Sequence, residues 1–301
     1  MENTFKSGFV SLVGRTNVGK STLLNSLAQE EVAITANKTQ TTRTAIKAII
    51  NRENSQIIIT DTPGIHKPKT KLSKAMVETA FGVFQEVDAI LFLIEANSTE
   101  IGRGDSRILE KIKEINKPCI LVINKIDLVN KEQLAKIISL YSKEYEFTSI
   151  VPVSAFKGKG IDDLILEIEK LMPEGPKYYS DDEYTDQTSR QLAEEKIREK
   201  ALKLLNDEVP HGIYVEVEKF KDRKTVKGED IIDIEATIYC LRESHKGIII
   251  GKSGSMLKRI STYARQDLEK IFRTKVNLKV WVKVKEDWQE KDNIVNKFKL
   301  K

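Results

Sequence analysis

The chain of 301 residues is long enough for about two domains, and its 40% hydrophobic content argues against wholesale disorder. Its longest apolar runs, such as Ala89–Ile94 and Cys119–Ile123, fall far short of the ~20 residues of a membrane-spanning helix, so we expect no integral membrane segment. Two distant cysteines exclude a disulfide framework, and three histidines argue against structural zinc. The first residues lack a basic and apolar leader, which favours a cytoplasmic protein.

Apolar runs alternate with amphipathic stretches up to about Met172. This alternation predicts the α/β class, with a doubly wound, mostly parallel sheet covered by helices on both faces. The predicted strands are Phe9–Val13, Thr44–Ile50, Gln56–Thr60, Ala89–Glu95, Cys119–Asn124 and Ile150–Val153. The predicted helices include Lys20–Ala28, Ser73–Glu86, Asp105–Ile115 and Ile161–Leu171.

A change of composition follows these elements. Pro173 and Pro176 end the last helix, because proline cannot continue one, and acidic residues follow among tyrosines. The stretch is typical of a solvated linker, in which Tyr178, Tyr179 and Tyr184 are candidate anchors. We therefore predict a first domain over residues 1–172, a linker over 173–188 and a second domain over 189–301.

The second domain begins with a helix near Ser189, whose apolar residues recur every four positions. The predicted order of its elements is helix, strand, strand, short helix, helix, strand, with His245 capping or preceding the short helix. Lys279 and Trp281 share the polar face of the last strand, and we favour packing against protein over stacking on RNA for Trp281. The segments after the first helix are Ile213–Phe220, Ile231–Leu241, His245–Ile250, Gly251–Gly254, a helix from Leu257 to Ile271, and Val276–Val284.

Basic residues are concentrated in this second domain. The whole chain carries a formal charge of only +5, whereas twelve basic residues between Arg242 and Lys285 face three acidic ones, a surplus of nine. Such a surplus suits a polyanion, either nucleic acid or an anionic membrane surface. A solvated lysine-rich face is an equally simple explanation of the charge alone.

A phosphate-binding pattern, G-x-x-x-x-G-K-[ST], lies between the first predicted strand and the first predicted helix. Its glycines let backbone N–H groups surround phosphate oxygens, and the helix N-terminus adds a positive dipole. Lys20 would reach the β- and γ-phosphates, and Ser21 would ligate Mg²⁺. A glycine-rich turn without a ligand is the alternative. The predicted nucleotide contacts here are Gly14, Arg15, Thr16, Asn17, Val18, Gly19, Lys20, Ser21 and Thr22.

Three later segments, each at the end of a predicted strand, favour GTP over ATP. Asp61 can hold Mg²⁺ through water, and the Gly64 N–H can reach the γ-phosphate. The Asp127 carboxylate can accept from the ring N–H and amino group of guanine, which adenine cannot reproduce. Asn124 would brace base and loop, and Lys125 would lie over the ring. The other predicted contacts are Thr62, Pro63, Ser154 and a backbone N–H at Ala155.

Together these segments resemble the G1, G3, G4 and G5 motifs of the translation-factor class of GTPases. The resemblance places switch I at Gln40–Arg43, with Thr42 as the threonine that caps Mg²⁺ in the GTP state. It implies Ser21, Thr42 and Asp61 as metal ligands. It also implies catalytic roles for Lys20, Thr42, Gly64 and Asn17.

One departure from that class bears on the mechanism. Ile65 stands where many regulatory GTPases carry a glutamine that orients the attacking water, and isoleucine can neither donate nor accept. In related GTPases an asparagine at the position of Asn17 coordinates a K⁺ ion that bridges the phosphates. Asn17 serves either this purpose or only the bracing of the loop. His66 is interpreted as a surface histidine rather than a catalytic base.

Gly251-Lys252-Ser253-Gly254 resembles the GxxG loop of a KH domain, and the predicted element order is that of the α+β type II KH fold. The glycines let the loop press against a single-stranded backbone while Lys252 neutralises a phosphate. Arg265 and its neighbours add salt-dependent attraction. A helix-capping turn is the alternative for the loop alone. The predicted RNA contacts are Gly251, Lys252, Ser253, Gly254, Lys258 and Arg259.

A P-loop GTPase followed by a linker and a type II KH domain resembles the Era family of bacterial GTPases over nearly the whole chain. The matching segments are GRTNVGKSTLLN, TQTTR, DTPGIHKPK, NKID, VSA, HKGIIIGKSG and VWVKVKEDW. The resemblance implies GTP or GDP with Mg²⁺ as ligands, K⁺ as an open question, and GTP hydrolysis. It implies that the KH domain holds the 3′ end of 16S rRNA and that the protein acts in assembly of the 30S subunit.

The same resemblance implies a monomeric cytoplasmic protein, with a fraction attached peripherally to the inner face of the plasma membrane. Two other interpretations stay open. One is a GTPase whose KH-like domain contacts only proteins, as in the tandem-GTPase Der family. The other is a membrane-attached signalling GTPase without an RNA ligand.

Overall fold

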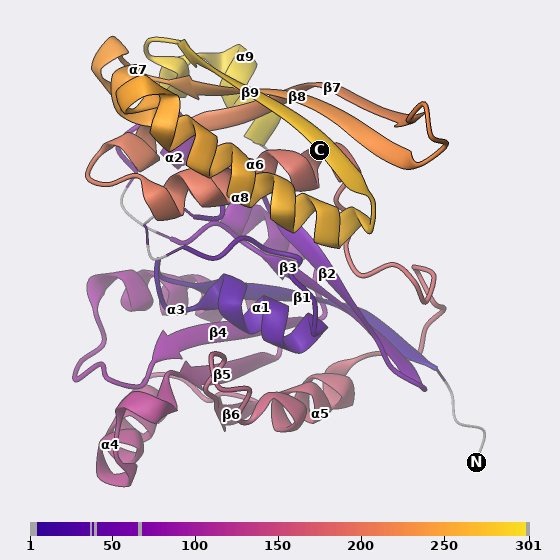
Figure 1. Cartoon of the computed structure of the whole chain (residues 1–301). Coiled ribbons are helices and arrows are strands. Elements are labelled where there is room, and N and C mark those ends of the chain that lie inside the picture. The colour runs from indigo at the N-terminus through magenta and orange to yellow at the C-terminus, as the bar shows by residue number, and fades with distance from the viewer. Residues whose placement is uncertain (1–4, 37, 39–40, 66–67, 299–301) are drawn as a thin grey trace. The chain divides into compact units, whose positions relative to one another are not determined.

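The computed structural model describes residues 5–36, 38, 41–65 and 68–298 (Figure 1). Two compact units are formed. Unit 1 comprises Met1–Ala33, Thr42–Asp186 and Val295–Lys301, and unit 2 comprises Ile34–Thr41 and Gln187–Ile294. Of the residues singled out above, Gln40 and His66 lie outside the described residues.

Unit 1 is built on a six-stranded sheet in the order β2-β3-β1-β4-β5-β6. All neighbouring strands are parallel except β2 and β3, which confirms the mostly parallel α/β sheet. The exception has a simple cause, since a connection as short as residues 52–54 cannot carry the crossover that parallel strands need. The strands are β1 Lys6–Gly14, β2 Ile46–Asn51, β3 Ser55–Asp61, β4 Ala89–Glu95, β5 Cys119–Asn124 and β6 Ser149–Pro152.

Helices cover both faces of this sheet, and β4 shows why. Ala89, Leu91 and Leu93 belong to one buried cluster, whereas Ile90 and Phe92 belong to the other. Helices α1 and α5 pack on the first cluster, and α2, α3 and α4 contribute to the second. The helices are α1 Lys20–Ala28, α2 Lys71–Gly82, α3 Arg103–Ile115, α4 Lys131–Ser142 and α5 Ile161–Leu171.

The stretch predicted as a solvated linker is attached to unit 1 up to Asp186. The backbone N–H groups of Tyr178 and Tyr179 donate to Gln56 Oε1 at 2.8 and 3.0 Å. Tyr184 packs against the apolar cluster beneath, and its carbonyl accepts from the Ile49 N–H at 3.0 Å. The segment is therefore held along β2 and β3, which the acidic composition did not indicate. The three domain boundaries given above stay a prediction.

Unit 2 contains a three-stranded sheet in the order β7-β8-β9, with β7 and β8 antiparallel and β8 and β9 parallel. Three helices pack against one face of it, and the element order is that of the predicted type II KH fold. Its elements are α6 Ser189–Leu204, β7 Tyr214–Lys224, β8 Asp230–Cys240, α7 Glu243–Ile250, α8 Ser255–Phe272 and β9 Lys275–Val284, and a short helix α9 Asp292–Val295 follows.

One expectation for unit 2 needs correction. Helix α7 already begins at Glu243, so His245 lies within its first turn rather than capping or preceding it. Trp281 is 43% exposed, and the packing role favoured for it stays a prediction. The other tryptophan, Trp288, is fully buried and donates from Nε1 to the Gly212 carbonyl at 3.0 Å.

No helix in the described part of the chain is long and apolar enough to cross a membrane.

Candidate nucleotide and RNA sites

The phosphate loop connects β1 to α1, and its geometry depends on Gly19. Gly19 has φ +99°, and a Cβ there would lie 2.4 Å from Asn124 Nδ2, so both conformation and space call for glycine. Lys20 is 6% exposed, and its Nζ donates to the carbonyls of Gly14 at 3.2 Å and Arg15 at 2.9 Å. Burial lowers the pKa of Lys20, against the opposing effect of Asp61. The loop thus wraps around its own ammonium group.

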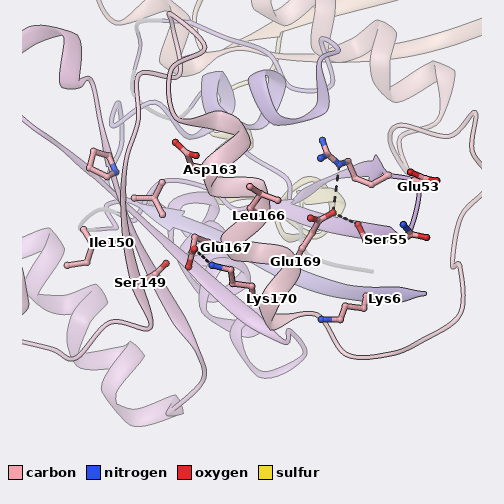
Figure 2. A pocket seen from close by; sticks show the side chains of 14 residues that line it. Lys6, Glu53, Ser55, Ser149, Ile150, Asp163, Leu166, Glu167, Glu169 and Lys170 are labelled. Atoms are coloured by element: carbon pink, nitrogen blue, oxygen red, sulfur yellow. Dashed lines mark hydrogen bonds and ion pairs between the residues drawn. The ribbon is translucent and has the colours of Figure 1, made fainter. Parts of the chain in front are cut away.

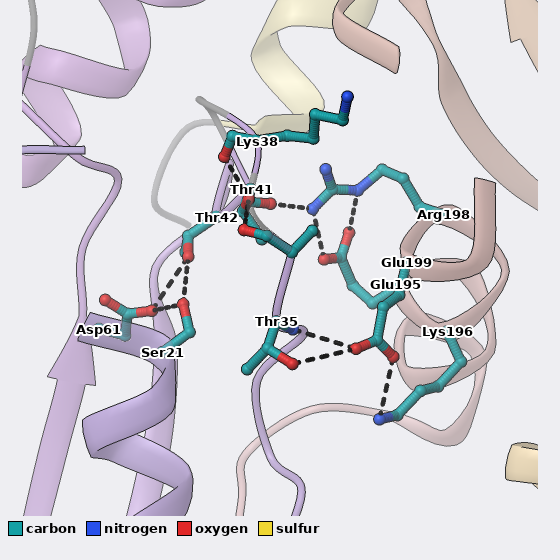
Figure 3. A network of polar contacts seen from close by, with 11 residues as sticks. Ser21, Thr35, Lys38, Thr41, Thr42, Asp61, Glu195, Lys196, Arg198 and Glu199 are labelled. Carbon is teal, nitrogen blue, oxygen red and sulfur yellow. Dashed lines mark hydrogen bonds and ion pairs between the residues drawn. The ribbon is translucent and has the colours of Figure 1, made fainter. Parts of the chain in front are cut away.

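Three oxygen side chains meet beside this loop (Figure 3). Ser21 Oγ and Thr42 Oγ1 each donate to Asp61 Oδ2 at 3.0 Å, and the two hydroxyls lie 3.0 Å apart. Asp61 is fully buried; burial raises the pKa of its carboxyl group, whereas Lys20 and the two hydroxyls lower it. The structure therefore brings together the three residues that sequence analysis named as metal ligands.

The donor set suits a magnesium ion that shares its coordination with phosphate and water. Mg²⁺ commonly takes one or two carboxylates from the protein and leaves its other positions to such ligands. Asp61 Oδ1 is buried and has no hydrogen-bond partner among the described residues, as expected for an oxygen that awaits a cation or its water. No cluster of three or more His, Cys, Asp or Glu side chains in the described ranges offers an alternative metal site.

The segment after β3 lies against the phosphate loop. Thr62 Oγ1 donates to the Leu12 carbonyl at 3.0 Å, and a Cβ on Gly64 would lie 2.8 Å from Thr16 Cγ2. The Ile65 N–H donates to the Gly14 carbonyl at 3.3 Å, and the Ile65 side chain is 3% exposed within the apolar core. Ile65 therefore serves packing, and its side chain has no means to hold water.

Asn124 connects the phosphate loop to the loop after β6. Its Nδ2 donates to the Val18 carbonyl at 2.9 Å, and its Oδ1 accepts from the Ala155 N–H at 3.0 Å. The Ser154 N–H donates to the Lys159 carbonyl at 3.0 Å. The backbone donors of this loop are thus directed to the protein at both positions. The Ala155 N–H fastens the loop to Asn124, and the Ser154 N–H closes the loop on itself.

Asp127 and Lys125 border the expected base site. Ser154 Oγ donates to Asp127 Oδ1 at 2.6 Å, and this hydrogen bond is the main reason that the Asp127 pKa is lowered. Lys125 Nζ donates to the Asn17 carbonyl at 3.0 Å and forms an ion pair with Glu95. A charged carboxylate and an ammonium group therefore stand just after the carboxyl end of β5, at the edge where α/β sheets bind ligands.

Two polar residues of this region make contacts that the sequence pattern did not indicate. The Arg15 side chain turns to α3, where its Nε lies 3.0 Å from Asp105 Oδ2, which also accepts from Tyr141 at 3.0 Å. Asn25, which was not singled out, exchanges two 2.8 Å hydrogen bonds with the backbone of Ala33. The one feature of the sequence that points to Asn25 is its amide side chain, which directly follows the buried Leu23 and Leu24 of α1. Val18, Thr22 and Pro63 lie within or beside the loops just described.

In unit 2 the Gly251–Gly254 loop projects between α7 and α8. Its left-handed residues are Gly251 at φ +71°, Ser253 at +51° and Gly254 at +79°, so the backbone turns sharply there. Lys252 and Ser253 are exposed, and on α7 beside them Ile248 is 51% exposed. The loop offers curvature, one ammonium group and an adjacent apolar side chain.

Ion pairs divide the basic residues of this unit into two groups. Arg265 lies 2.8 Å from Glu269, and Lys246, Lys275 and Lys283 also pair with carboxylates, so their charges are partly neutralised. Within the described ranges, Lys252, Lys258 and Arg259 have no carboxylate at ion-pair distance, and all three are exposed. The charge available to a polyanion therefore includes the loop and the first turns of α8. It extends to Arg242, Lys270, Arg273 and Lys279, which are also exposed and have no carboxylate at ion-pair distance in the described ranges.

A cavity of about 920 Å³ lies elsewhere in unit 1 (Figure 2). It is bordered by the first residues of three strands, Lys6, Ser55 and Ser149, and thus lies at the amino ends of the strands, opposite the motif loops. Several of its charged groups are already engaged, as Glu169 accepts from Ser55 at 2.6 Å and pairs with Arg52, and Lys170 pairs with Glu167. Neither position nor chemistry links this cavity to the nucleotide.

Comparison with known proteins agrees with this geometry. Residues 9–125 match a family model described as 50S ribosome-binding GTPase, and residues 208–289 match a KH domain model. GTPase Era of Thermoanaerobacter sp. (strain X514) is 53% identical over 97% of this chain and 96% of that protein. GTPase Era of Clostridioides difficile (strain 630) is 52% identical over 98% of each.

Two solved structures resemble nearly the whole chain. One is a crystal structure of Era in complex with MgGDPNP and nucleotides 1506–1542 of 16S ribosomal RNA, with a TM-score of 0.92, 42% identity and 98% coverage of each chain. The other is an Aquifex aeolicus Era variant bound to GDP and AlF₄⁻, with a TM-score of 0.93, 41% identity and coverage of 98% of this chain and 99% of that one. This chain belongs to the Era family of GTPases.

Proposed function

We propose that this chain is a GTP-hydrolysing switch that binds the single-stranded 3′ end of 16S rRNA through its KH domain and acts in assembly of the 30S subunit. The observation that carries this proposal is the likeness, at 42% identity over 98% of the chain, to an Era protein that holds MgGDPNP and 16S rRNA together. The buried Ser21, Thr42 and Asp61 set and the exposed Gly251–Gly254 loop supply matching sites in this chain.

For the hydrolytic step we assign residue roles as follows. Ser21, Thr42 and Asp61 would hold Mg²⁺, which when bound neutralises charge on the phosphates. The Lys20 ammonium, which donates to two carbonyls, would bind β- and γ-phosphate oxygens instead, and the Gly64 N–H would donate to the γ-phosphate. Water attacks the γ-phosphorus, the bond to the bridging oxygen breaks, and GDP and phosphate leave.

We also propose that the Asn17 side chain binds K⁺ beside the phosphates. Asn17 has φ +67°, and the Lys125 ammonium already braces its carbonyl at 3.0 Å. Its side chain is exposed and has no hydrogen bond in the described part of the chain. The bracing of the loop therefore runs through the main chain, which supports a separate purpose for the amide oxygen.

This ion proposal is tested by single-turnover GTP hydrolysis in KCl and in NaCl. We expect hydrolysis in K⁺ to be about tenfold faster, because a cation at this point stabilises charge that develops in the transition state. Asn17→Gly keeps the left-handed backbone without strain and removes the amide, so it should abolish the difference. Equal rates of the unaltered protein in both salts would refute the proposal.

The RNA proposal is tested by filter binding of an oligonucleotide that matches the 3′ end of 16S rRNA, with GDP and with a non-hydrolysable GTP analogue. We expect tighter binding with the analogue, and loss of binding in the Lys252→Asp, Ser253→Asp double variant, since it places two negative charges at the loop. Tighter binding in one state requires reciprocal coupling of the two sites. Equal binding in both states would leave an RNA-binding GTPase without the switch. Absence of binding would favour the alternative in which the KH domain contacts only proteins.

We also propose that the protein is monomeric and cytoplasmic and that a fraction of it associates peripherally with the membrane. The exposed Lys252, Lys258 and Arg259 supply positive charge for an anionic lipid surface. Sedimentation with vesicles of anionic lipid, compared with neutral lipid, tests it. Binding to anionic vesicles that survives the Lys252 and Ser253 double variant, together with absent RNA binding, would favour the alternative of a signalling GTPase at the membrane.

A further inference from the structure

The chain that leads into switch I, from Ala33 to Thr42, is fixed in unit 1 at both of its ends. At the first end, Asn25 exchanges two 2.8 Å hydrogen bonds with the backbone of Ala33. At the second end, Thr42 Oγ1 donates to Asp61 Oδ2 at 3.0 Å. The residues between these two points, Ile34–Thr41, belong to unit 2. The contacts that this middle part makes inside unit 2 therefore bear on the metal-binding threonine.

Helix α6 holds the middle part through two charged side chains (Figure 3). Glu199 Oε1 accepts from the Thr35 N–H at 3.1 Å and from Thr35 Oγ1 at 3.4 Å. Arg198 Nη2 donates to the carbonyl of Thr41. Thr41 is the residue directly before Thr42, so Arg198 acts one peptide bond away from the group that reaches Asp61.

These charges are buried, which needs a reason. Arg198 is 2% exposed and Glu199 3% exposed. Arg198 is oriented by Glu195 at 2.6 and 3.0 Å, and Glu199 pairs with Lys196 and Lys203. Burial raises the pKa of Glu199, but these lysines outweigh it, so the pKa lies below its ordinary value. Apolar side chains often stabilise a fold as well as buried ion pairs do, so stability alone does not account for these ion pairs. They suit a role in fixing one conformation.

We propose that Arg198 and Glu199 are positioning residues of the GTPase site. They hold Thr35 and Thr41 in place, and Thr41 directly precedes Thr42, whose hydroxyl donates to Asp61. The inference rests on the proposed function, in which Thr42 takes part only in the GTP state. Loss of the Arg198 contact should then weaken binding of a GTP analogue and leave GDP binding unchanged.

The same helix offers control residues matched in the type of contact, of which Arg190 is exposed where Arg198 is buried. Arg190 Nη1 donates to the Val217 carbonyl at 2.6 Å, and Glu194 Oε1 accepts from the Val217 N–H at 2.8 Å. In both pairs an arginine donates to a carbonyl and a glutamate accepts from an N–H. Arg190 and Glu194 make these contacts with β7, whereas Arg198 and Glu199 make them with the chain that leads into switch I. They separate the role of the contact itself from the role of its position.

The experiment measures affinities for fluorescent GDP and a fluorescent non-hydrolysable GTP analogue with Mg²⁺. For Arg198→Met we expect about tenfold weaker binding of the analogue and GDP affinity within about twofold of the unaltered protein, since one charge-assisted hydrogen bond is lost. Single-turnover hydrolysis should fall by a similar factor. Arg190→Met should change neither affinity.

A second pair of variants guards against simple misfolding. Glu199→Gln keeps the shape and removes the charge, and it should weaken binding of the analogue by a smaller factor, with Glu194→Gln unchanged. Equal losses for GDP and the analogue, or equal effects of Arg190→Met and Arg198→Met, would overturn the inference. If the unaltered protein hydrolyses GTP and Arg198→Met matches it, only this inference fails; if the unaltered protein does not hydrolyse GTP, the proposed function fails.

Discussion

The nucleotide edge of unit 1 and the Gly251–Gly254 loop of unit 2 offer phosphate groups opposite surroundings. At the first, Lys20 and Asp61 are buried and held by neighbouring protein atoms. At the second, Lys252 and Ser253 are exposed, and the backbone supplies mainly curvature. The first site is held by protein atoms on all sides, whereas the second leaves its side chains exposed for the RNA contacts proposed above. Substitutions at the first site should therefore change which nucleotide is bound. Substitutions at the second site should change the shape of the loop.

The largest effect is expected at the organised site. Asp127→Asn should weaken GTP binding about a thousandfold, because the amide presents a donor where guanine also presents donors and leaves buried polar groups unpaired. The same variant should bind xanthosine triphosphate better than the unaltered protein does. Competition of both triphosphates against a fluorescent nucleotide measures this exchange, with Asp162→Asn on the exposed side of α5 as the control. An unchanged preference for GTP would show that Asp127 does not read the base.

An intermediate effect is expected from loop shape. Gly251 and Gly254 both have positive φ, but a Cβ would lie 2.7 Å from Met256 Cβ at Gly251 and in open space at Gly254. Gly251→Ala should cost about 3 kcal/mol of unfolding free energy, from left-handed strain and overpacking together, whereas Gly254→Ala should cost about 1 kcal/mol from strain alone. Urea unfolding measures both. Equal costs would mean that the loop relaxes freely, and GTP affinity should stay constant in either variant.

The smallest effect concerns an ion pair on the hairpin of β7 and β8. Arg223 Nε lies 2.6 Å from Asp233 Oδ2, and with the amide of Asn277 it holds the pKa of Asp233 at about 2. That pKa lies below the unfolded value of about 3.9, so the stabilisation is present above pH ~4 and is lost as the pH falls through 2. The stability difference between the unaltered protein and Asp233→Asn should accordingly shrink between pH 6 and pH 2. A difference that stays constant in urea unfolding would contradict the assignment.

The elements that sequence analysis predicted well are those with strong apolar periodicity. The bounds of α1, β4 and β5 agree with the prediction, because their buried residues leave one pattern possible. Helix α4 was not named, and β2 begins two residues later than expected and pairs antiparallel. Strand direction depends on the tight connection to β3, which a pattern of hydrophobic residues does not record.

For the sites, motif order was enough to bring Ser21, Thr42 and Asp61 together in expectation. It was not enough for Arg198 and Glu199, since a charged position on a helix is normally taken as solvated, whereas here both side chains are buried against a segment distant in the chain. Nor did it show that the Ala155 N–H is engaged by Asn124. Such long-range polar pairs leave no periodic trace in one sequence.

The attachment of residues 178–186 along β2 has a consequence for solubility. Strand β2 is an outer strand of the six-stranded sheet, and its free edge would be a template for pairing with another chain. Thr185 bridges to Ala48 in antiparallel fashion, and its hydroxyl donates to the Lys47 carbonyl at 2.9 Å. The opposite outer strand, β6, is only four residues long and ends at Pro152. Residues 178–186 thus protect the β2 edge of the sheet from aggregation. The short length of β6 and its terminal Pro152 protect the opposite edge.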